Sequence, residues 1–413
     1  MSDGGWVYGP YGLDAARNRT VRWERTVLAV VHTVTAGTRL GDVVPLLEPD
    51  PRIQVVFTWA PSSANAGGVR EFLHRLGGVT IPWRQATAER FDLAVAAWDG
   101  RLHELHAPVL SLPHGVGAGK LIRRWDGFGP EAPRETAAPD RARLVYRGRV
   151  IPSAVIVPTW RQLAQLGKAC PEAEGIAVVG GDPCCDRLVA SLPLRPEYRR
   201  AVGTAGRRLV VVSSTWGQGS LLQRGPGLIM RILDGLPAGA FQVAAVIHPN
   251  AWACHGQRAI CGWLAGAVRR GLVLVPPEDG WRALLAAADL VIGDHGSVTC
   301  YGAAAGVPVL LASFPEHDID PETPPAQLGR LAGRLRPGEP VASQAEDAIA
   351  TWHAGASAAM RGHITDLPGQ SAVVIRAAMY RLMRLPEPQS EPECRPVAVP
   401  EPVVIPESFG GLR

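Results

Sequence analysis

Hydrophobic residues in this chain gather in short runs that are apolar at nearly every position, and amphipathic stretches separate these runs. The first two runs cover residues 27–31 and 53–57, and helix-like stretches follow them at 38–47 and 66–76. Uninterrupted apolar strands that alternate with helices indicate a parallel sheet covered on both faces. The pattern predicts one Rossmann-like domain, and further apolar runs continue it at residues 93–97, 109–112, 154–157 and 176–179.

The same alternation starts again after a segment rich in Arg, Gly and Pro at residues 193–208. A second set of buried strands and helices of this kind predicts a second doubly wound sheet. Open α/β sheets bind ligands beyond the carboxyl ends of their strands, so we expect the two domains to face a cleft. The predicted strands are 209–212, 242–247, 272–275, 291–293 and 307–311, and the predicted helices are 221–236, 257–270, 281–288, 342–360 and 371–383.

These patterns divide the chain into four predicted segments. The last predicted helix, 371–383, is expected to pack back across the domain boundary. Residues 385 onward are dominated by Pro and Glu, which supply neither a helix nor a sheet ladder, so this tail is expected to be extended or disordered. The segments are an arm at 1–25, a Rossmann-like domain at 26–192, a second one at 205–384 and the tail at 385–413.

Composition narrows the class of protein. At 413 residues and 46% hydrophobic content, the chain can bury two sizeable cores. A net charge of +4 with only scattered basic pairs argues against a nucleic-acid-binding surface. No charged leader precedes an apolar segment and no apolar run could cross a bilayer, so we expect a cytoplasmic protein without a transmembrane segment. Peripheral membrane contact and the oligomeric state stay open, and the seven cysteines are expected to be reduced.

A polar turn between a predicted strand and a predicted helix is the most informative stretch of the chain. It contains Asp294, His295, Gly296 and Ser297, and the helix is expected to begin near Val298. The first N–H groups of such a helix point beyond the sheet edge and favour a phosphate or another anion. The alternative is that Asp294 or Ser297 only caps the helix. The turn is therefore a candidate site for a nucleotide-linked donor.

Three other predicted strands end in residues that could carry chemistry. His114 follows one strand and is succeeded by Gly115, Gly117 and Lys120, and these glycines permit close approach of a ligand to the backbone. His248 follows another strand and is succeeded by a proline. Imidazole groups at strand ends can act as a general base or stabilise a diphosphate leaving group. A turn rich in hydroxyl groups, with Ser214, Thr215 and Trp216, could hold phosphate oxygens. Another turn follows a predicted strand at residues 180–186, and there Asp182 is expected to cap a helix.

The order of these motifs resembles CDP-glycerol glycerophosphotransferases, the teichoic-acid polymerase-like enzymes of the GT-B fold. The resemblance covers about residues 105–315. It rests on His-Gly after an N-terminal strand, Gly-Asp-Pro-x-x-Asp-Arg-Leu, a Thr-Trp turn, His-Pro-Asn, and Gly-Asp-x-x-Ser-Val followed by Gly-x-Pro-Val-Leu. It implies a GT-B transferase that moves a glycosyl or polyol-phosphate group from a CDP- or UDP-type donor to a hydroxyl acceptor. No metal ion and no cofactor is implied.

The resemblance also implies a role for each matched residue. The N-terminal domain would bind the acceptor and the C-terminal domain the nucleotide donor. His114 would be the base, and Gly115, Gly117 and Lys120 would form an acceptor loop. His248 would join the catalytic groups at the donor. The donor phosphates would lie among Ser214, Thr215, Trp216, Asp294, His295, Gly296, Ser297 and Val298, and Val275 and Pro276 would read the base.

The chain departs from the family pattern at three places. The family continues His-Gly with Thr-Pro-Leu-Lys, whereas this chain has Val-Gly-Ala-Gly before Lys120. The family has Asp-Tyr-Ser-Ser where this chain has Asp-His-Gly-Ser at 294–297, and it has an Arg near His-Pro that is missing here. Two alternatives therefore stay open. One is an enzyme like a UDP-sugar 2-epimerase, in which Glu316 and His317 would matter more, and the other is a non-catalytic GT-B scaffold.

Overall fold

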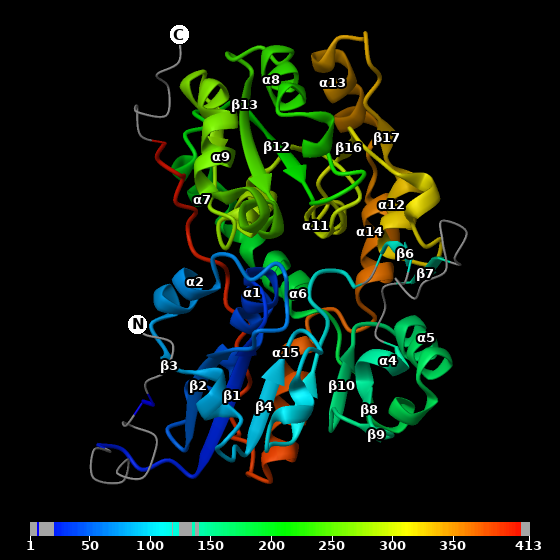
Figure 1. Ribbon diagram of the computed structural model, residues 1–413. Coiled ribbons are helices and arrows are strands. Elements are labelled where there is room, and N and C mark those ends of the chain that lie inside the picture. The colour runs from blue at the N-terminus through cyan, green and yellow to red at the C-terminus, as the bar shows by residue number, and fades with distance from the viewer. Residues whose placement is uncertain (1–5, 8–19, 118, 124–133, 137–139, 406–413) are drawn as a thin grey trace. The chain divides into compact units, whose positions relative to one another are not determined.

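A computed structural model describes residues 6–7, 20–117, 119–123, 134–136 and 140–405 (Figure 1). The chain forms two compact units. Unit 1 consists of Met1–His114, Pro139–Cys184 and Asp366–Cys394, and unit 2 consists of Gly115–Ala138, Cys185–Thr365 and Arg395–Arg413. Both units are discontinuous in the sequence, and the chain crosses between them several times.

Unit 1 is built on a parallel sheet of seven strands. The order of the strands reverses between β1 and β4, because later strands add beside β4 while β2 and β3 add on the other side of β1. The order across the sheet is β11 (Ala177–Val179), β10 (Ala154–Val157), β5 (Val109–Ser111), β4 (Leu93–Ala96), β1 (Arg25–Val31), β2 (Ile53–Trp59) and β3 (Val79–Ile81).

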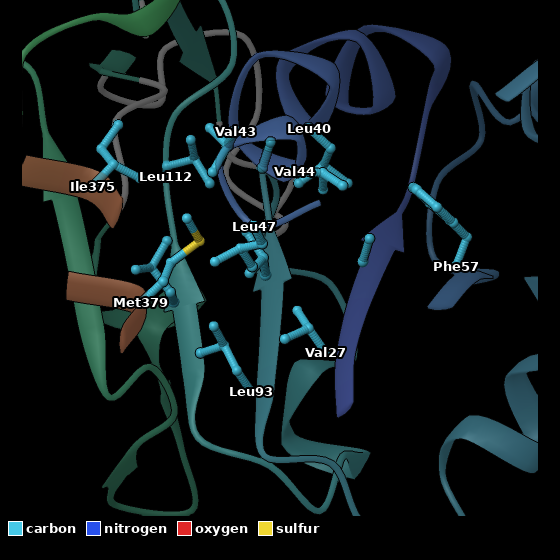
Figure 2. Packing of buried hydrophobic residues seen from close by; sticks show 14 of the residues in the cluster. Val27, Leu40, Val43, Val44, Leu47, Phe57, Leu93, Leu112, Ile375 and Met379 are labelled. Carbon is cyan, nitrogen blue, oxygen red and sulfur yellow. The ribbon is translucent and has the colours of Figure 1, made fainter. Parts of the chain in front are cut away.

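The alternation of side chains along β1 divides the core of unit 1 into two layers. Val27 and Ala29 face a cluster that is covered by α1 (Val34–Val43), α2 (Val69–Leu76) and α15 (Ser371–Met383), as Figure 2 shows for part of it. Leu28 and Val30 belong to a second cluster, with residues of α3 (Trp83–Ala86) and the 3₁₀ turn η3 (Leu102–Glu104). Because residues 27–31 of β1 are buried on both faces, these five positions must be apolar, as the sequence shows.

The outer part of unit 1 packs a third, smaller cluster around β10 and β11. It is covered by α5 (Trp160–Ala169) and the 3₁₀ helix η4 (Pro171–Ile176). Thr159 starts α5 by accepting a hydrogen bond from the backbone N–H of Gln162 at 3.1 Å. The short helix α4 (Arg141–Leu144) leads into a hairpin of β8 (Val145–Tyr146) and β9 (Arg149–Val150).

Unit 2 contains a parallel sheet of six strands whose order is that of a Rossmann domain. The strand order reverses between β12 and β15, which makes their carboxyl ends the expected place for a ligand. The order across the sheet is β14 (Val273–Leu274), β13 (Phe241–Ile247), β12 (Arg208–Ser214), β15 (Leu290–Gly293), β16 (Val309–Leu311) and β17 (Gly333–Arg334).

Helices on both sides of this sheet complete unit 2. One buried cluster joins the sheet to α8 (Gly227–Asp234), α9 (Pro249–Arg269) and α13 (Val341–Thr351). A second group of helices packs against one another near β15 and β16. It comprises α7 (Arg195–Ala201), α10 (Trp281–Ala287), α11 (Ser297–Ala304), α12 (Pro324–Leu331) and α14 (Ala354–Ile364), while α6 (Pro183–Ser191) begins at the junction of the two units. None of the helices in the described part of the chain is long and apolar enough to cross a membrane.

The predicted fold class of two Rossmann-like parallel-sheet domains is confirmed, but several helix boundaries were wrong. The helix expected at 38–47 begins four residues earlier, because Thr33 accepts a hydrogen bond from Ala36 N–H at 3.1 Å and caps it. The helix expected at 342–360 is two helices, and the ring of His353 caps the second. Helix α9 starts at Pro249 rather than 257, and the helix expected at 221–236 forms only as α8 after Pro226.

The described part of the C-terminal tail, residues 385–405, forms neither a helix nor a strand and contacts both units in turn. Residues 385–394 group with unit 1, where Arg376 pairs with Glu387 at 2.6 Å. The following residues group with unit 2, where the buried hydroxyl of Tyr198 donates to the carbonyl oxygen of Val397 at 2.7 Å. Val403 N–H then donates to the carbonyl of Leu274 in the edge strand β14. Helix α15 contributes to the core of unit 1, as the sequence predicted for residues 371–383.

Candidate functional site

The loops that follow β12 and β15 in unit 2 are joined by one buried carboxylate. Asp294 is fully buried, and its Oδ2 accepts the backbone N–H groups of Thr215 at 2.9 Å and Leu221 at 2.7 Å. Its Oδ1 accepts Gly296 N–H at 3.0 Å. These two strands are the pair at which the strand order reverses, so Asp294 fixes both loops of the expected ligand site.

Burial raises the pKa of Asp294 to about 6, although the three backbone N–H groups lower it. All the hydrogen bonds found for this carboxylate are internal. A buried carboxylate would also repel a phosphate. The position of Asp294 therefore fits a residue that orders the turn rather than one that contacts an anionic ligand.

The N-terminus of α11 lies directly after this carboxylate. Its first residue is Ser297, its N-cap is Gly296, and no side chain caps it. A Cβ atom at Gly296 would lie 2.9 Å from Cβ of Thr215, so glycine permits the close approach of the two loops. Ser297 and Val298 are partly exposed. The first turn of α11 thus presents N–H groups without a side-chain acceptor, which is the usual local structure of an anion site.

His295 is a buried polar side chain next to this helix terminus. It is 4% exposed, and neither ring nitrogen has a hydrogen-bond partner among the described residues. Burial, together with the nearby ammonium of Lys120, lowers its pKa to about 3, so the ring is neutral. A buried polar group without a partner is costly by about 1–3 kcal/mol, which is offset if a ligand supplies the missing hydrogen bond.

Lys120 brings a positive charge to the same turn. Its Nζ donates to the carbonyl oxygens of Trp216 at 3.3 Å and Gln218 at 3.2 Å. Burial lowers the pKa of Lys120, while the carboxylates of Asp294 and Asp318 raise it. The sequence placed Lys120 in an acceptor loop, whereas its contacts are with the loop after β12 in unit 2.

Gly115 and Gly117 accompany Lys120 into unit 2 and both have positive φ, of 62° and 90°. Residues other than glycine rarely adopt this backbone conformation. Between them, Val116 N–H donates to Oγ of Ser297 at 3.3 Å. A Cβ at Gly115 would meet the Oγ of Ser297 at 2.5 Å. The glycines therefore allow this segment to lie directly against the first residue of α11.

His248 ends β13 and caps α9 in unit 2. Its Nδ1 accepts the backbone N–H of Asn250 at 3.0 Å, so the neutral ring carries its proton on Nε2. Its own backbone N–H donates to the carbonyl of Ser214 at 3.0 Å. The Trp216 ring lies 6.2 Å from that of His248, between centroids, and is 42% exposed. His248 thus presents a hydrogen-bond donor on the same strand-end edge as Ser214.

Ser214, Val275 and Pro276, the last two of which were expected to contact the nucleotide base, have mainly structural roles. Ser214 is 2% exposed, donates to the carbonyl of Thr215 and accepts Leu222 N–H, so it shapes the loop. Val275 is fully buried and its N–H donates to Ala245. Pro276 has no N–H. The segment at 275–276 can therefore offer only carbonyl oxygens to a nucleotide base.

In unit 1, His114 follows β5, and its ring has the tautomer opposite to that of His248. Its Nδ1 lies 3.1 Å from the carbonyl of Ala97, which can only accept, so Nδ1 carries the proton and Nε2 is an acceptor. The ring lies 5.1 Å from that of Trp98. Burial lowers the pKa of His114 to about 4. The ring is therefore neutral near pH 7 and can accept a proton on Nε2.

Sequence reasoning missed two polar groups at the strand reversal of unit 1. His32 follows β1, is fully buried, and its Nε2 donates to the carbonyl of Gly100 at 2.7 Å. Asp99 follows β4, and Oγ of Ser111 donates to it at 3.0 Å. Both residues come directly after a buried strand in the sequence. The same signal that identified His248 and Asp294 could have found them.

Two further predicted residues lie in ion pairs. Asp182, expected as a cap, pairs with Arg39 at 3.1 Å, and both side chains are buried. Glu316, which the epimerase alternative emphasises, pairs with Arg334 at 3.2 Å, and its side chain is 70% exposed. His317 lies beside it in the 3₁₀ turn η7 (Glu316–Asp318).

Structural comparison places the fold among known proteins. No protein-family model matches the chain, and no curated protein does. The structure of the wall teichoic acid polymerase TagF has the same fold with a TM-score of 0.59 and 13% identity, over 88% of this chain and 90% of that one. The UDP-GlcNAc 2-epimerase of Neisseria meningitidis, bound to UDP-GlcNAc, matches with a TM-score of 0.51 and 13% identity, over 86% of this chain and 100% of that one.

A third structure, the UDP-GlcNAc 2-epimerase of Methanocaldococcus jannaschii, gives a TM-score of 0.52 at 13% identity, over 86% of this chain and 99% of that one. The expected structural resemblance to teichoic-acid polymerase-like proteins of the GT-B fold is confirmed. At this level of identity the likeness shows the fold alone.

Proposed function

We propose that the protein is a transferase that moves a glycosyl or polyol-phosphate group from a nucleotide-activated donor to a hydroxyl acceptor. The observation that carries the proposal is the buried ring of His295, whose nitrogens have no partner among the described residues, beside the uncapped first turn of α11. A phosphate oxygen would accept hydrogen bonds from both. The fold is compatible with this function, because the wall teichoic acid polymerase TagF shares it.

In this proposal unit 2 binds the donor phosphates. The first N–H groups of α11 and the hydroxyl of Ser297 donate to phosphate oxygens, and Lys120 supplies a positive charge. Lys120 takes over the role of the family arginine that this chain lacks. His248 donates from Nε2, and Asp294 acts as a positioning residue through the loops that it joins.

In unit 1, His114 is the proposed base. The acceptor oxygen forms a bond to the transferred carbon or phosphorus, and the acceptor proton passes to Nε2 of His114. The bond from the transferred group to the departing nucleotide phosphate breaks, and its electron pair stays on that phosphate. Hydrogen bonds from α11 and His248 stabilise the charge that develops there.

The donor site is tested by calorimetric titration with CDP, UDP and GDP. We expect one nucleotide to bind, and His248→Ala and Ser297→Ala to weaken its binding at least tenfold while the fold is retained. His255→Ala, at an exposed position of α9, is the matched control and should bind as the unaltered protein does. If no nucleotide binds at millimolar concentration, the protein is better explained as a scaffold.

An epimerase is the second candidate, because two of the structures with this fold are UDP-GlcNAc 2-epimerases. The two functions are separated by incubation with UDP-N-acetylglucosamine alone. An epimerase converts the sugar without an acceptor, whereas the proposed transferase leaves it unchanged. Conversion of the sugar under these conditions would replace the transferase proposal.

A further inference from the structure

Unit 1 contains a cavity of about 300 Å³ beside the exit of β4. Its lining continues from Trp98 and Asp99 along η3 to the hairpin of β8 and β9. This volume is at the lower end of the range of about 300–1,000 Å³ that is typical of ligand pockets. One end of the cavity follows β4, a strand at which the order of the sheet reverses, where α/β sheets commonly bind ligands.

The exit of β4 is held rigidly by three polar contacts. The carbonyl of Ala97 accepts from His114, the carbonyl of Gly100 accepts from His32, and Asp99 accepts from Ser111. Trp98 packs against the ring of His114. The four residues from Ala97 to Gly100 thus contact His114, the proposed base, at one end and line the cavity at the other.

Asp99 is the carboxylate among the residues that line the cavity. Its Oδ1 accepts from Ser111 at 3.0 Å, and no hydrogen bond to its other oxygen is found among the described residues. Burial raises the pKa of Asp99, while Ser111 and the guanidinium of Arg143 lower it. Ionised, the second oxygen accepts a hydrogen bond from a hydroxyl group.

The two arginines that line the cavity each face a carboxylate, which disfavours an anionic ligand. Arg101 forms two hydrogen bonds with Glu104, at 2.6 and 2.8 Å. Arg143 lies over the ring of Trp98 at 5.0 Å and faces Asp99. The remaining lining is apolar or aromatic and includes Val145, Ile151 and Tyr146, whose ring stacks on His103. C–H groups and hydroxyl groups of a sugar or polyol suit such a mixed lining.

We propose that this cavity binds the neutral, polyhydroxylated acceptor of the reaction, a sugar or a polyol, with Asp99 accepting a hydrogen bond from one of its hydroxyl groups. The proposal rests on the proposed transferase function for its role, but the binding site itself is independent of the nucleotide. It extends the site by residues that the resemblance does not include.

The test is ligand-observed NMR and calorimetry without nucleotide, using glycerol, glucose and N-acetylglucosamine as neutral probes and inorganic phosphate as the anionic probe. We expect a neutral probe to bind, and Asp99→Asn and Tyr146→Ala to weaken its binding at least tenfold. Tyr146 is 41% exposed, so its replacement should leave the fold intact. Asp347→Asn in α13 and Trp160→Ala in α5, which lie outside the cavity, are the matched controls and should bind normally.

Three results would overturn the pocket: no neutral probe binds, both cavity variants bind like the unaltered protein, or phosphate alone binds and loses affinity in these variants. Nucleotide titration of the same preparations separates the two proposals. A protein that binds nucleotide but no neutral probe refutes the pocket alone. A protein that binds the neutral probe through Asp99 but no nucleotide refutes the transferase and retains the pocket.

Discussion

Two histidines at equivalent strand ends have opposite hydrogen-bonding roles because their backbone partners differ. The ring of His114 lies against a carbonyl at Nδ1, so its Nε2 is an acceptor, whereas the ring of His248 accepts an N–H at Nδ1, so its Nε2 is a donor. An acceptor suits removal of a proton, and a donor suits a phosphate oxygen. The choice depends on Ala97 and Asn250, whose backbone positions follow from the fold, so residue identity alone could not assign the roles.

His32 makes the stability of unit 1 depend on pH. Burial lowers its pKa from 6.5 to about 4, so the unfolded chain binds a proton between these values that the folded protein excludes. The free energy of unfolding should therefore be unaffected by this group above pH 6.5, fall as the pH drops from 6.5 to about 4, and lose on the order of 3 kcal/mol in total.

This prediction is measured by urea unfolding at pH 7.5 and 4.5. His32→Gln keeps a donor for the carbonyl of Gly100 but does not titrate, so it should lose less stability on acidification than the unaltered protein. His255→Gln, at an exposed position, is the control and should leave the pH dependence unchanged. An identical loss in all three proteins would show that His32 is not the group responsible.

At the scale of elements, the sequence predicted the strands well and the helix boundaries poorly. Residues 27–31 of β1 and 243–247 of β13 are apolar without a break because both faces of the sheet are buried there, and this pattern is visible without the structure. Helix ends depend on single capping groups such as Thr33 and His353, which hydrophobic periodicity does not reveal. The two-residue strand β17 and the hairpin β8–β9 are too short to produce a pattern.

The candidate site was also predictable in part, because the strands that precede its residues are visible in the sequence. His248, Asp294 and Ser297 follow strands of one sheet, so the carboxyl edge gathers them, as the sequence indicated. Burial separates their roles, because Asp294 is fully buried and accepts hydrogen bonds from backbone N–H groups, while Ser297 is partly exposed. Lys120 reaches the same turn because residues 115–138, which follow β5 of unit 1 in the sequence, belong to unit 2. This is a long-range contact that local sequence does not encode.

Helix α9 contains a kink whose cause can be tested with one pair of glycines. Gly256 has φ 79° and ψ 152°, which interrupts the helical geometry, and a Cβ there would meet nothing within 4 Å. Gly256→Ala should therefore destabilise the protein by about 1–3 kcal/mol through backbone strain alone.

The matched control is Gly262→Ala in the same helix, where a Cβ also meets nothing within 4 Å but φ lies outside the positive range. This change should stabilise the protein by about 0.5–1 kcal/mol, because alanine favours a helix more than glycine does. Denaturant unfolding gives both values. Equal effects at the two positions would mean that the kink at Gly256 is not a strained backbone.

For the whole molecule, the discontinuity of unit 1 is the main feature that the predicted boundaries do not contain. The expected division at about residue 192 assigned residues 371–383 to the second domain, whereas Ile375 and Met379 of α15 lie in the core of unit 1 with Leu93 (Figure 2). A single fragment ending near residue 192 would lack one of the helices that cover that core. Unit 1 can fold completely only after the chain has passed through unit 2.

This connection predicts that α15 affects strands more than 270 residues earlier in the chain, because Ile375 and Leu93 belong to one buried cluster. Both side chains are fully buried, so Ile375→Ala should cost about 2–5 kcal/mol by leaving a cavity. Hydrogen exchange should show lost protection in β1 and β4 of unit 1, while β12 and β13 of unit 2 keep theirs. Val373→Ala on the same helix, where the side chain is 50% exposed, should change neither. Because the two substitutions share a helix and differ in burial, equal protection in β1 for both variants would contradict the assignment of α15 to the core of unit 1.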